Sequence, residues 1–420
     1  MRILVVGSGG REHAICWAIN KSPKLTKLFC CPGNAGILQV AECIDINYKD
    51  FASLINFAKQ NHIDLTICPM DEPLVLGIVD AFEAAGLKIF GPNKRAAIIE
   101  GSKAYSKDFM KRYNIDTAAY ELFHDFEAAL LYAKTAAYPL VVKADGTAAG
   151  KGVSICYNYE EAKATLKDIM VWKKFGDAGN CVVLEEFLSG VECSVLAFCD
   201  GFNLAVMPSA KDHKAAYNGD KGPNTGGMGV ITPNPHYTDE INDICMSKIF
   251  LPTIEGLRKD NREFMGIMFF GLMLTKNGPK VLEYNVRPGD AETQTLLPLL
   301  QTDFLDIILS CLNKDLDKLE ITWKNKSVAC VVAASKGYPE KYSVGYPIAG
   351  LALQNNLDDT LVFHAGTKLK DNIILTNGGR VLNAVAMADS LSSARDKAYQ
   401  ALETISFTDI YYRTDIGKDL

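Results

Sequence analysis

The sequence predicts a multidomain protein of mixed α/β and α+β class, with a parallel-sheet domain first and a small mixed α/β domain last. The first observation is length, because 420 residues suffice for two to four domains that each bury a core. The second is the alternation of strand and helix patterns over the first hundred residues, which is typical of a parallel sheet wound with helices. The third is a change beyond about residue 327 to short strands separated by Gly and Pro turns.

The individual elements follow from the periodicity of apolar residues. In the first hundred residues we expect strands at 2–6, 26–31, 64–68 and 87–90, and helices at 11–20, 50–61 and 73–85. In the middle of the chain we expect a helix from about 102, a hairpin of strands 139–142 and 153–157, a helix at 159–171, a strand at 181–186, a helix at 238–259 and strands at 265–275 and 279–287. A last helix is expected at 390–403.

Composition narrows the class of protein. Apolar residues make up 48% and charged residues 22% of the chain, as in soluble globular proteins. The net charge is -6 with no concentrated basic tract, so nucleic-acid binding is not expected, and no apolar run reaches the length of a membrane span. The twelve cysteines include no CxxC pair. This argues against a zinc site or a disulfide framework and favours buried thiols in a reducing cytoplasm.

The first strand runs into a glycine-rich turn, "GSGGREHA". A dinucleotide-binding fingerprint would need a third glycine where Glu12 stands, and an acidic residue at the end of the second strand, where the sequence reads "FCCPGN". Nicotinamide chemistry is therefore not expected. Backbone N–H groups at a helix start beside Arg11 suit a single phosphate monoester, although a tight turn without a ligand uses glycine equally well.

A second glycine-rich stretch, "KADGTAAGKG", lies between two apolar strands. Three residues rather than four separate Gly146 from Gly150, and Gly152 stands where a P-loop has Ser or Thr. The alternative is a flexible hairpin that closes over nucleotide phosphates, with Lys143 before it and Lys151 within it. An ordinary solvent-exposed hairpin would explain the glycines but leaves the two lysines unexplained.

Two sets of acidic residues could serve a nucleotide and its metal ion. In "KVLEYNVR", strand alternation places Glu283, Asn285 and Arg287 on one face, where a carboxylate and an amide oxygen suit Mg²⁺. In "VVLEEFLSGVE", Glu185 and Glu186 end a strand and Glu192 follows a turn, as at a hinge that binds adenine and ribose. Each pattern alone also fits an ordinary half-buried strand or solvated acids, so only their combination indicates a nucleotide site.

The chain as a whole resembles the ATP-grasp ligases, and within them the phosphoribosylamine–glycine ligase family. The motifs "GSGGREHA", "PGNAG", "EGSKAYSKDF", "KADGTAAGKGV", "EEFL", "DHK", "GPNTGGMG", "LEYN", "GDAETQ" and "TNGGRV" occur in family order over nearly the whole length. The resemblance implies a pre-ATP-grasp domain at 1–101, an ATP-grasp core at 102–327 with a lid subdomain at about 120–187, and a C-terminal domain at 328–420. It implies a reaction of purine biosynthesis that joins 5-phosphoribosylamine to glycine with conversion of ATP to ADP and phosphate.

The resemblance also implies roles for individual residues. ATP would contact Lys103, Lys143, Gly150, Lys151, Glu185, Glu186 and Glu192, and Mg²⁺ or Mn²⁺ would be bound by Glu283 and Asn285. The substrates would contact Gly9, Gly10, Arg11, Glu12, Asn34, Asn224, Thr225, Gly226, Gly289 and Asp290, with Arg287, Asp212 and Lys214 as catalytic residues. The expected partners are small molecules, with no nucleic acid or membrane, in a monomer or weak dimer.

The chain departs from the family pattern on the substrate side. Pro69-Met70-Asp71 stands where the family usually has Gly-Pro-Glu, and Ala215 replaces an arginine after "DHK". Pro288 and Ala291 replace a usual phenylalanine and proline. These departures leave open a second hypothesis, an ATP-grasp ligase with a different acid or amine. A non-catalytic nucleotide-binding protein would have lost the metal and lid residues, which are present here.

Overall fold

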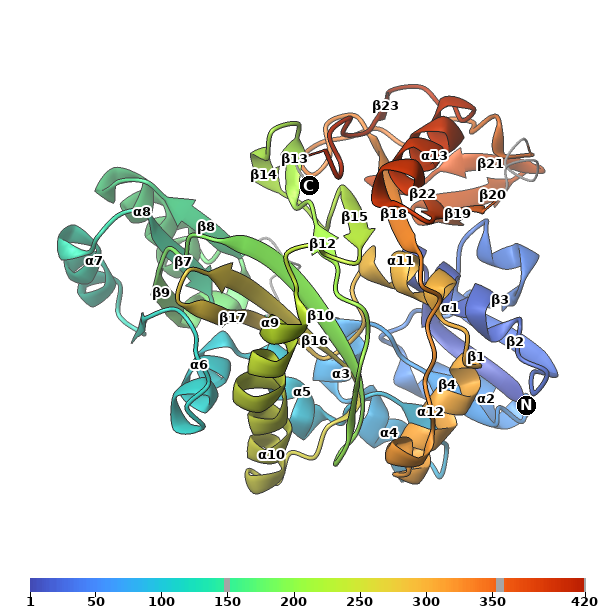
Figure 1. The fold of residues 1–420 in the computed structure, drawn as a ribbon, viewed down its shortest axis with the longest axis horizontal. Coiled ribbons are helices and arrows are strands. Elements are labelled where there is room, and N and C mark those ends of the chain that lie inside the picture. Colours follow the sequence, from blue (N-terminus) through green and yellow to red (C-terminus); the bar gives the residue numbers. More distant parts are fainter. Residues whose placement is uncertain (147–151, 353–358, 419–420) are drawn as a thin grey trace.

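The computed structural model describes residues 1–146, 152–352 and 359–418. The N-terminal part is a five-stranded parallel sheet in the order β3-β2-β1-β4-β5, shown in blue in Figure 1. Its strands are β1 (Arg2–Gly7), β2 (Lys27–Pro32), β3 (Glu42–Cys43), β4 (Leu65–Ile67) and β5 (Ile89–Phe90). Its helices are α1 (Gly10–Ile19), α2 (Phe51–Gln60), α3 (Asp71–Leu76) and α4 (Ile78–Ala84). The predicted parallel α/β class is confirmed for this region.

The helix expected at 73–85 is wrong in one respect, because the structure divides it into α3 and α4 at Gly77. The backbone of Gly77 has φ of 99°, in the region that L-residues with side chains rarely adopt. The chain turns there and continues as a separate helix. The short edge strand β3 was not expected, since two residues carry no periodic signal.

The region that the sequence predicts as a lid subdomain, called the lid below, lies at one end of the molecule, at the left in Figure 1. Helices α5 (Lys94–Gly101) and α6 (Lys103–Arg112) lead into it. Its antiparallel sheet has the order β6-β9-β7-β8, made of Tyr120–Phe123, Val182–Glu186, Leu140–Ala144 and Val153–Cys156. Helix α7 (Phe126–Thr135) and helix α8 (Tyr159–Leu166), which continues as a π-helical turn to Val171, pack on this sheet through a small apolar cluster of their own.

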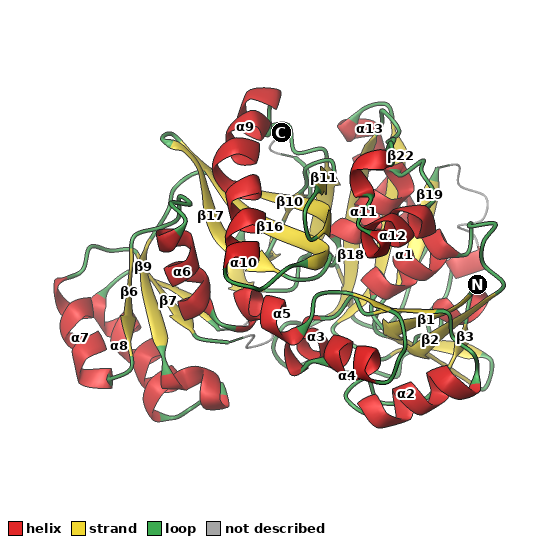
Figure 2. Ribbon diagram, turned by 90° about the horizontal axis from the view of Figure 1, so that it is seen from below, coloured by secondary structure: helices red, strands yellow, loops and turns green. Residues whose placement is uncertain are grey.

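The central sheet has the order β11-β10-β16-β17, made of Leu204–Val206, Val191–Asp200, Met265–Thr275 and Gly278–Asn285. A long helical column covers one face of it, as Figure 2 shows: α9 (Asp239–Cys245), a π-helical turn over Met246–Phe250, and α10 (Leu251–Lys259). Phe250 of the column packs on Phe270 with ring centroids 4.3 Å apart, and Thr253 bonds the Tyr284 hydroxyl at 2.9 Å. The column therefore fixes the strand that carries Glu283 and Asn285.

The C-terminal sheet draws strands from two parts of the chain. Its order is β12-β15-β18-β22-β19 with β23 also paired to β18, and its strands are Lys211–Asp212, Gly229–Thr232, Ser327–Ser335, Arg380–Ala388, Thr360–His364 and Ile410–Tyr411. Hairpins β13–β14 (Ala215–Tyr217, Lys221–Asn224) and β20–β21 (Thr367–Lys370, Ile373–Thr376) flank it, with helices α11 (Glu292–Leu299), α12 (Phe304–Asn313) and α13 (Leu391–Glu403). Because β12 and β15 precede the expected boundary at 328, this sheet joins the middle of the chain to its end.

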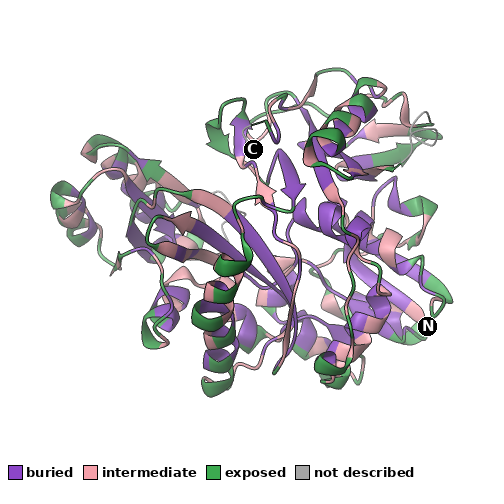
Figure 3. Cartoon of the chain, in the orientation of Figure 1, coloured by how far each residue is buried: buried purple, intermediate pink, exposed green. Residues whose placement is uncertain are grey.

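Burial follows the layers, and the strands of the three larger sheets are the most buried parts of the molecule (Figure 3). Eleven of the twelve cysteines are buried, which fits thiols used as small apolar side chains. Short 3-10 turns lie at Ile37–Gln39, Gly176–Asn180 and Leu316–Lys318. In the described part of the chain, no helix combines the length and apolar character needed to cross a membrane.

Two buried histidines join the first and last domains. His13 on α1 accepts a hydrogen bond from the backbone N–H of His364 on β19 at 2.8 Å, with the imidazole rings 5.6 Å apart. Burial lowers the pKa of His13 to about 3, with a further contribution from His364. Burial also lowers the pKa of His364 to about 4. Both imidazoles are therefore neutral in the folded protein at neutral pH.

This pair predicts a loss of stability in acid. The unfolded chain binds a proton at each histidine below about pH 6.5, whereas the folded chain resists protonation down to about pH 4. The free energy of unfolding should therefore fall as the pH drops from about 6.5 to 4, by about 3 kcal/mol for each histidine. His13→Asn keeps an acceptor in place of Nδ1 and should flatten this slope in denaturant titrations, whereas His62→Asn at an exposed histidine should not. An unchanged slope in His13→Asn would contradict this account.

Candidate functional site

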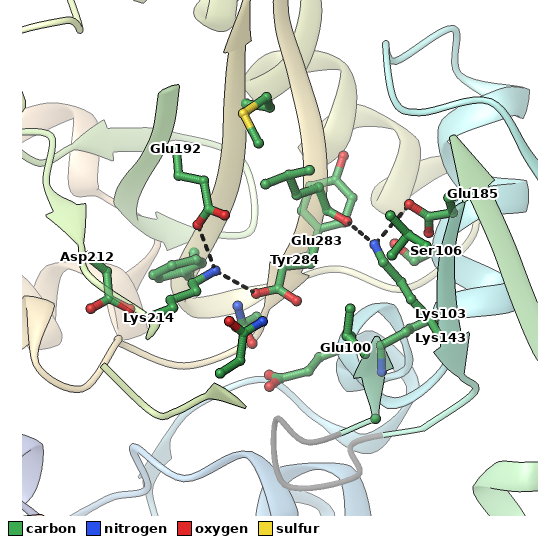
Figure 4. A pocket seen from close by; sticks show the side chains of 18 of the residues that line it. Glu100, Lys103, Ser106, Lys143, Glu185, Glu192, Asp212, Lys214, Glu283 and Tyr284 are labelled. Carbon is green, nitrogen blue, oxygen red and sulfur yellow. Dashed lines mark hydrogen bonds and ion pairs between the residues drawn. The ribbon is translucent and has the colours of Figure 1, made fainter. Parts of the chain in front are cut away.

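One deep pocket lies between the lid, the central sheet and the start of the C-terminal sheet (Figure 4). Its lining includes most of the residues singled out in the sequence: Lys103, Lys143, Glu185, Glu186, Glu192, Asp212, Lys214, Asn224, Thr225, Gly226, Glu283, Asn285, Arg287, Gly289 and Asp290. These residues come from positions far apart in the sequence. The fold therefore gathers the nucleotide-type and substrate-type motifs around one space.

Glu185 is the buried anion of the lid side. Its Oε2 lies 2.9 Å from the Lys143 Nζ and 3.2 Å from the Lys107 Nζ, and all three side chains are less than a tenth exposed. Burial lowers the pKa of Lys107 to about 8, although Glu185 opposes that shift. The second carboxylate oxygen, Oε1, is buried without a hydrogen-bond partner among the described residues. Glu185 therefore holds two cations in place and keeps one acceptor available.

Lys103 ties the start of α6 to the glycine-rich loop. Its Nζ donates to the carbonyl of Gly146 at 2.5 Å, and the backbone N–H of Ala104 donates to Asp145 at 3.1 Å. The same lysine lines the pocket. The chain therefore leaves β7 beside Lys103, a cation that lines the pocket. Gly150 and Lys151, expected to contact ATP, lie outside the described residues.

The strand β17 presents the expected metal ligands to the pocket, with one irregularity. Gly271 pairs with Glu283 and Leu272 with Val281, so Leu282 forms a β-bulge. The bulge turns the Leu282 carbonyl toward the Lys143 Nζ, 3.3 Å away, and lets Leu282 line the pocket beside Glu283. Simple alternation along the strand would instead place Leu282 on the face opposite to Glu283.

Arg287 does not continue the strand as expected, because β17 ends at Asn285. Its guanidinium instead folds back, and Nη2 donates to Asn285 Oδ1 at 3.1 Å and lies 3.6 Å from Glu100 Oε1. Glu100 also accepts the backbone N–H of Val286 at 2.6 Å. Glu100 therefore fixes the chain directly after the expected metal ligands.

Lys214 bridges two carboxylates across the floor of the pocket. Its Nζ lies 3.3 Å from Glu192 Oε2 and 3.7 Å from Glu283 Oε1, as Figure 4 shows. Glu192 first, and then Glu283, raise the pKa of Lys214, so it is a cation at neutral pH. Burial would raise the pKa of Glu283, but Lys214 and the other cations outweigh it and lower that pKa. Glu283 is therefore ionised, which is the state that a cation ligand needs.

Asp212 differs from the other carboxylates of the pocket. Burial, and then the charge of Glu292, raise its pKa well above the ordinary value. Its Oδ1 is buried and accepts no hydrogen bond from the described residues. Glu292 is itself buried and accepts a bond from the Ser194 hydroxyl at 2.9 Å. Asp212 is thus a carboxyl group that can carry a proton near the Lys214 end of the pocket.

The loop at 224–226 and the turn at 289–290 line the part of the pocket where the sequence predicts that the substrates bind. Thr225 donates through its backbone N–H and its hydroxyl to the Lys214 carbonyl, both at 2.8 Å. Gly289 has no room for a side chain, since a Cβ there would lie 2.2 Å from Glu292 Oε2. Gln294 donates to Asp290 Oδ1 at 2.5 Å. Asn224 is exposed at the rim.

The N-terminal turn lies next to this end of the pocket rather than in its lining. At the start of α1, the N–H of Gly9 donates to Glu12 Oε2 at 2.5 Å, and Arg11 pairs with Glu12 at 2.6 Å. The Arg11 Nη1 also donates to the Pro288 carbonyl at 3.1 Å. The carboxylate of Glu12 therefore already occupies the start of α1.

Two further residues of the turn region pack closely against other parts of the chain. A Cβ at Gly10 would meet the amides of Asn383 and Gln294 within 2.6 Å. Asn34 donates to the carbonyls of Ser8 and His364 at 2.8 Å, which joins the turn to the C-terminal sheet. Asn34 thus has a structural role in the described chain.

The departures from the family pattern lie at the same end. Asp71 lines the pocket, and although burial would raise its pKa, Arg287 and Arg11 lower it. Ala215 is buried on β13, where its carbonyl accepts a bond from Arg413 at 3.1 Å. Arg413 therefore binds the backbone of this residue, and neither Arg413 nor Ala215 lines the pocket.

Several pocket residues were missed from the sequence. Glu100, Ser106, Lys107 and Glu292 line the pocket, and Arg380 contacts two of its loops. Glu100 and Lys107 lie within "EGSKAYSKDF", and Arg380 within "TNGGRV", so the motifs were noticed but the individual side chains were not. Nothing in their local spacing indicates which of them turn inward.

The buried arrangement around Glu185 predicts a specific loss of stability. Glu185→Gln keeps the shape but leaves Lys107 and Lys143 buried without a counter-charge, and should lower the free energy of unfolding by about 3–5 kcal/mol. Glu186→Gln removes an exposed carboxylate from the adjacent position and should cost less than about 1 kcal/mol. Denaturant unfolding followed by circular dichroism measures both. Equal stability of the two variants would show that Glu185 does not stabilise the lysine pair.

Comparison with known proteins finds the same family along nearly the whole chain. The family models for the N domain, the ATP-grasp (A) domain and the C domain of phosphoribosylglycinamide synthetase match residues 1–100, 101–293 and 328–419. The phosphoribosylamine–glycine ligase of Caldanaerobacter subterraneus is 49% identical over 99% of both chains. That of Fusobacterium nucleatum is 50% identical over 99% of this chain and 98% of its own.

A solved structure gives the same result in three dimensions. The crystal structure of phosphoribosylamine–glycine ligase from Thermotoga maritima is 33% identical, covers 99% of this chain and 100% of its own, and superposes with a TM-score of 0.87. The three-domain architecture with an ATP-grasp core is therefore confirmed. The chain belongs to the phosphoribosylamine–glycine ligase family of ATP-grasp enzymes.

Proposed function

We propose that this chain is an ADP-forming ligase that joins 5-phosphoribosylamine to glycine, giving glycinamide ribonucleotide, ADP and phosphate. The observation that carries the proposal is the convergence of Lys103, Lys143, Glu283 and Asn285 on one pocket in a chain of this family. The neighbouring loops at 224–226 and 289–290 supply a second, polar end of that pocket. A nucleotide and an acid substrate can thus be held side by side.

The chemistry explains why both ends are needed. A carboxylate is a poor electrophile at neutral pH. An oxygen of the glycine carboxylate attacks the γ-phosphorus of ATP, the bond to ADP breaks, and glycyl phosphate forms. The amine nitrogen then attacks the carbonyl carbon, phosphate leaves, and the nitrogen loses a proton. No side-chain nucleophile takes part, so alignment and charge neutralisation supply the catalysis.

On the nucleotide side, we assign Lys103, Lys143 and the loop containing Gly150 and Lys151 to the phosphates of ATP. Glu185, Glu186 and Glu192 are assigned to the adenosine. The buried, unpartnered Oε1 of Glu185 supports this, since an acceptor in that position suits an amino or hydroxyl donor.

The donor set at β17 fits a divalent cation. Glu283 is ionised and Asn285 adds a second hard oxygen beside it, and Mg²⁺ sites commonly combine one or two carboxylates with the phosphates of the substrate. The described residues hold no cluster of three or more His, Cys, Asp or Glu that could bind a metal alone. When bound, Mg²⁺ neutralises charge on the phosphates, and we propose that Mn²⁺ can replace it.

On the substrate side, we assign Lys214 and Arg287 to the charge of the glycine carboxylate and of the glycyl phosphate. Asp212 is assigned, in its ionised form, to accept the proton of the attacking amine, which its buried and unpartnered Oδ1 suits. Asn224, Thr225, Gly226, Gly289 and Asp290 would line the glycine end. The turn Gly9, Gly10, Arg11 and Glu12, with Asn34, is assigned to the phosphoribosylamine.

We place the protein in the cytoplasm as a monomer or weak dimer, acting on small molecules alone. The buried thiols support a reducing compartment, and an acidic chain without a basic tract supports the absence of nucleic-acid partners.

The direct test is release of ADP with glycine and freshly made phosphoribosylamine. Turnover with that pair, and much slower turnover with alanine, serine or other amines, is the expected result. Turnover only with a different acid or amine would overturn the proposal and favour a second ligase activity, which the departures at Met70, Asp71 and Ala215 make worth testing.

Glu283→Ala should reduce kcat by more than about 100-fold, because it removes the ionised metal ligand. Glu255→Ala, at an exposed position on α10, is the matched control and should leave kcat unchanged. Both variants are assayed with saturating glycine and phosphoribosylamine over a range of Mg²⁺ concentrations. Near-normal activity of Glu283→Ala at every concentration would show that the metal assignment is wrong.

A further inference from the structure

Arg380, in the C-terminal domain, contacts two residues that line the pocket, Gly226 and Asp290. It is the first residue of β22, in the same strand that packs along β18 at the centre of the C-terminal sheet. Its guanidinium leaves that sheet and reaches two loops that precede the domain in sequence. It contacts Gly226 and Gly227, which lie 154 and 153 positions earlier in the chain, and Asp290, which lies 90 positions earlier.

The contacts of Arg380 are made by one nitrogen to three carbonyls and by another to a carboxylate. Nη1 donates to the carbonyls of Gly226 and Asp290, the latter at 2.7 Å, and more weakly to that of Gly227 at 3.4 Å. Nη2 lies 3.2 Å from Asp290 Oδ2. The side chains of Arg380 and Asp290 are both less than a fifth exposed. A planar fork with fixed donors is suited to joining two separate loops in this way.

A second residue of the C-terminal domain holds the same loop from the other side. The backbone N–H of Gly226 donates to the Tyr338 hydroxyl at 3.1 Å, while its carbonyl accepts from Arg380. A Cβ at Gly226 would lie 3.0 Å from the Arg380 Cζ, so the glycine lets the peptide pack against the guanidinium. Both backbone polar groups of Gly226 thus bind side chains from the C-terminal domain.

The two loops held by Arg380 are the ones assigned to the substrate end. Gly226 and Asp290 line the pocket. Thr225, the residue before Gly226, donates its hydroxyl to the Lys214 carbonyl. Asp290 also lies against the N-terminal turn, since a Cβ at Gly9 would be 3.2 Å from its Oδ2. Arg380 therefore stands where all three domains meet.

We propose that Arg380 is a positioning residue for the ligation, which sets the spacing between the 224–227 loop and the 287–291 loop and so shapes the glycine and amine subsites. The inference rests on the proposed function for its kinetic readout. The hydrogen bonds and the ion pair of Arg380 join it to residues 226–227 and 290, and none joins it to Lys103, Lys143 or Glu185, so we assign it no part in holding the nucleotide. Its loss should therefore affect the two substrates and leave ATP binding nearly intact.

The kinetic test compares Arg380→Ala and Arg380→Lys with the unaltered protein. The Ala variant removes four contacts and should lower kcat/KM for glycine and for phosphoribosylamine by about 10- to 100-fold, while KM for ATP changes less than about threefold. The Lys variant keeps the charge without the fork and should recover only part of the loss. Added guanidinium ion at millimolar concentration should restore part of the activity of Arg380→Ala.

Arg413→Lys is the matched control. Arg413 is likewise buried in the C-terminal part and reaches back to the 215–220 hairpin, through the Ala215 carbonyl and Asp220, but its partners do not line the pocket. This variant should lower the melting temperature and leave the ratio of the three KM values unchanged. An equal rise in all three KM values for Arg380→Ala, or the same kinetic loss in Arg413→Lys, would reduce Arg380 to a structural role and overturn the inference.

Hydrogen exchange gives a readout that does not depend on the substrates. In Arg380→Ala, amides at 224–229 and 287–291 should exchange faster, with those of β7 and β9 unchanged. If the unaltered protein fails to turn over glycine and phosphoribosylamine, the proposed function falls, and the exchange rates still decide whether Arg380 holds the two loops. Unchanged exchange in both loops would overturn the inference whatever the activity.

Discussion

The pocket depends on pairing cations with carboxylates, which are buried around Glu185 and partly exposed around Lys214. A lysine taken out of water without a counter-charge loses its proton or destabilises the fold. Glu185 supports Lys107 and Lys143 at one end, and Glu192 with Glu283 supports Lys214 at the other. The cations are thus held in position before any phosphate arrives, which is the preorganisation that phosphoryl transfer requires.

The second constraint is the sheet that the middle and the end of the chain build together. Strands β12 and β15 flank the loop containing residues 224–226 and pair, through β15, with β18 of the C-terminal part. Asp212 lies on β12, so the position of this carboxyl depends on strands more than a hundred residues later. The nucleotide end has no such dependence, because β7, β9 and β17 belong to the lid and the central sheet.

The sequence predicts the residues that local strand patterns place in the pocket, and it misses those that only distant segments bring there. Glu185, Glu283 and Asn285 stand on apolar strands that the sequence predicts, and the parallel sheet of the first hundred residues has strong periodicity. The division of the helix at Gly77 and the bulge at Leu282 depend on local backbone geometry that composition does not reveal. Lys107 lies on a helix face like any other lysine, and only the later strand β9 brings Glu185 to it. Arg380 is a still longer-range case, since its partners come from two distant loops.

The claim at the centre of this account is that the carboxylate is activated as an acyl phosphate. Glycine labelled with ¹⁸O in its carboxylate tests it directly, with ATP, Mg²⁺ and phosphoribosylamine present and the released phosphate examined by mass spectrometry or ³¹P NMR. We expect one labelled oxygen in the phosphate for each amide formed and none in ADP, because the attacking oxygen leaves with the phosphorus. Unlabelled phosphate released together with the ligated product would contradict the account.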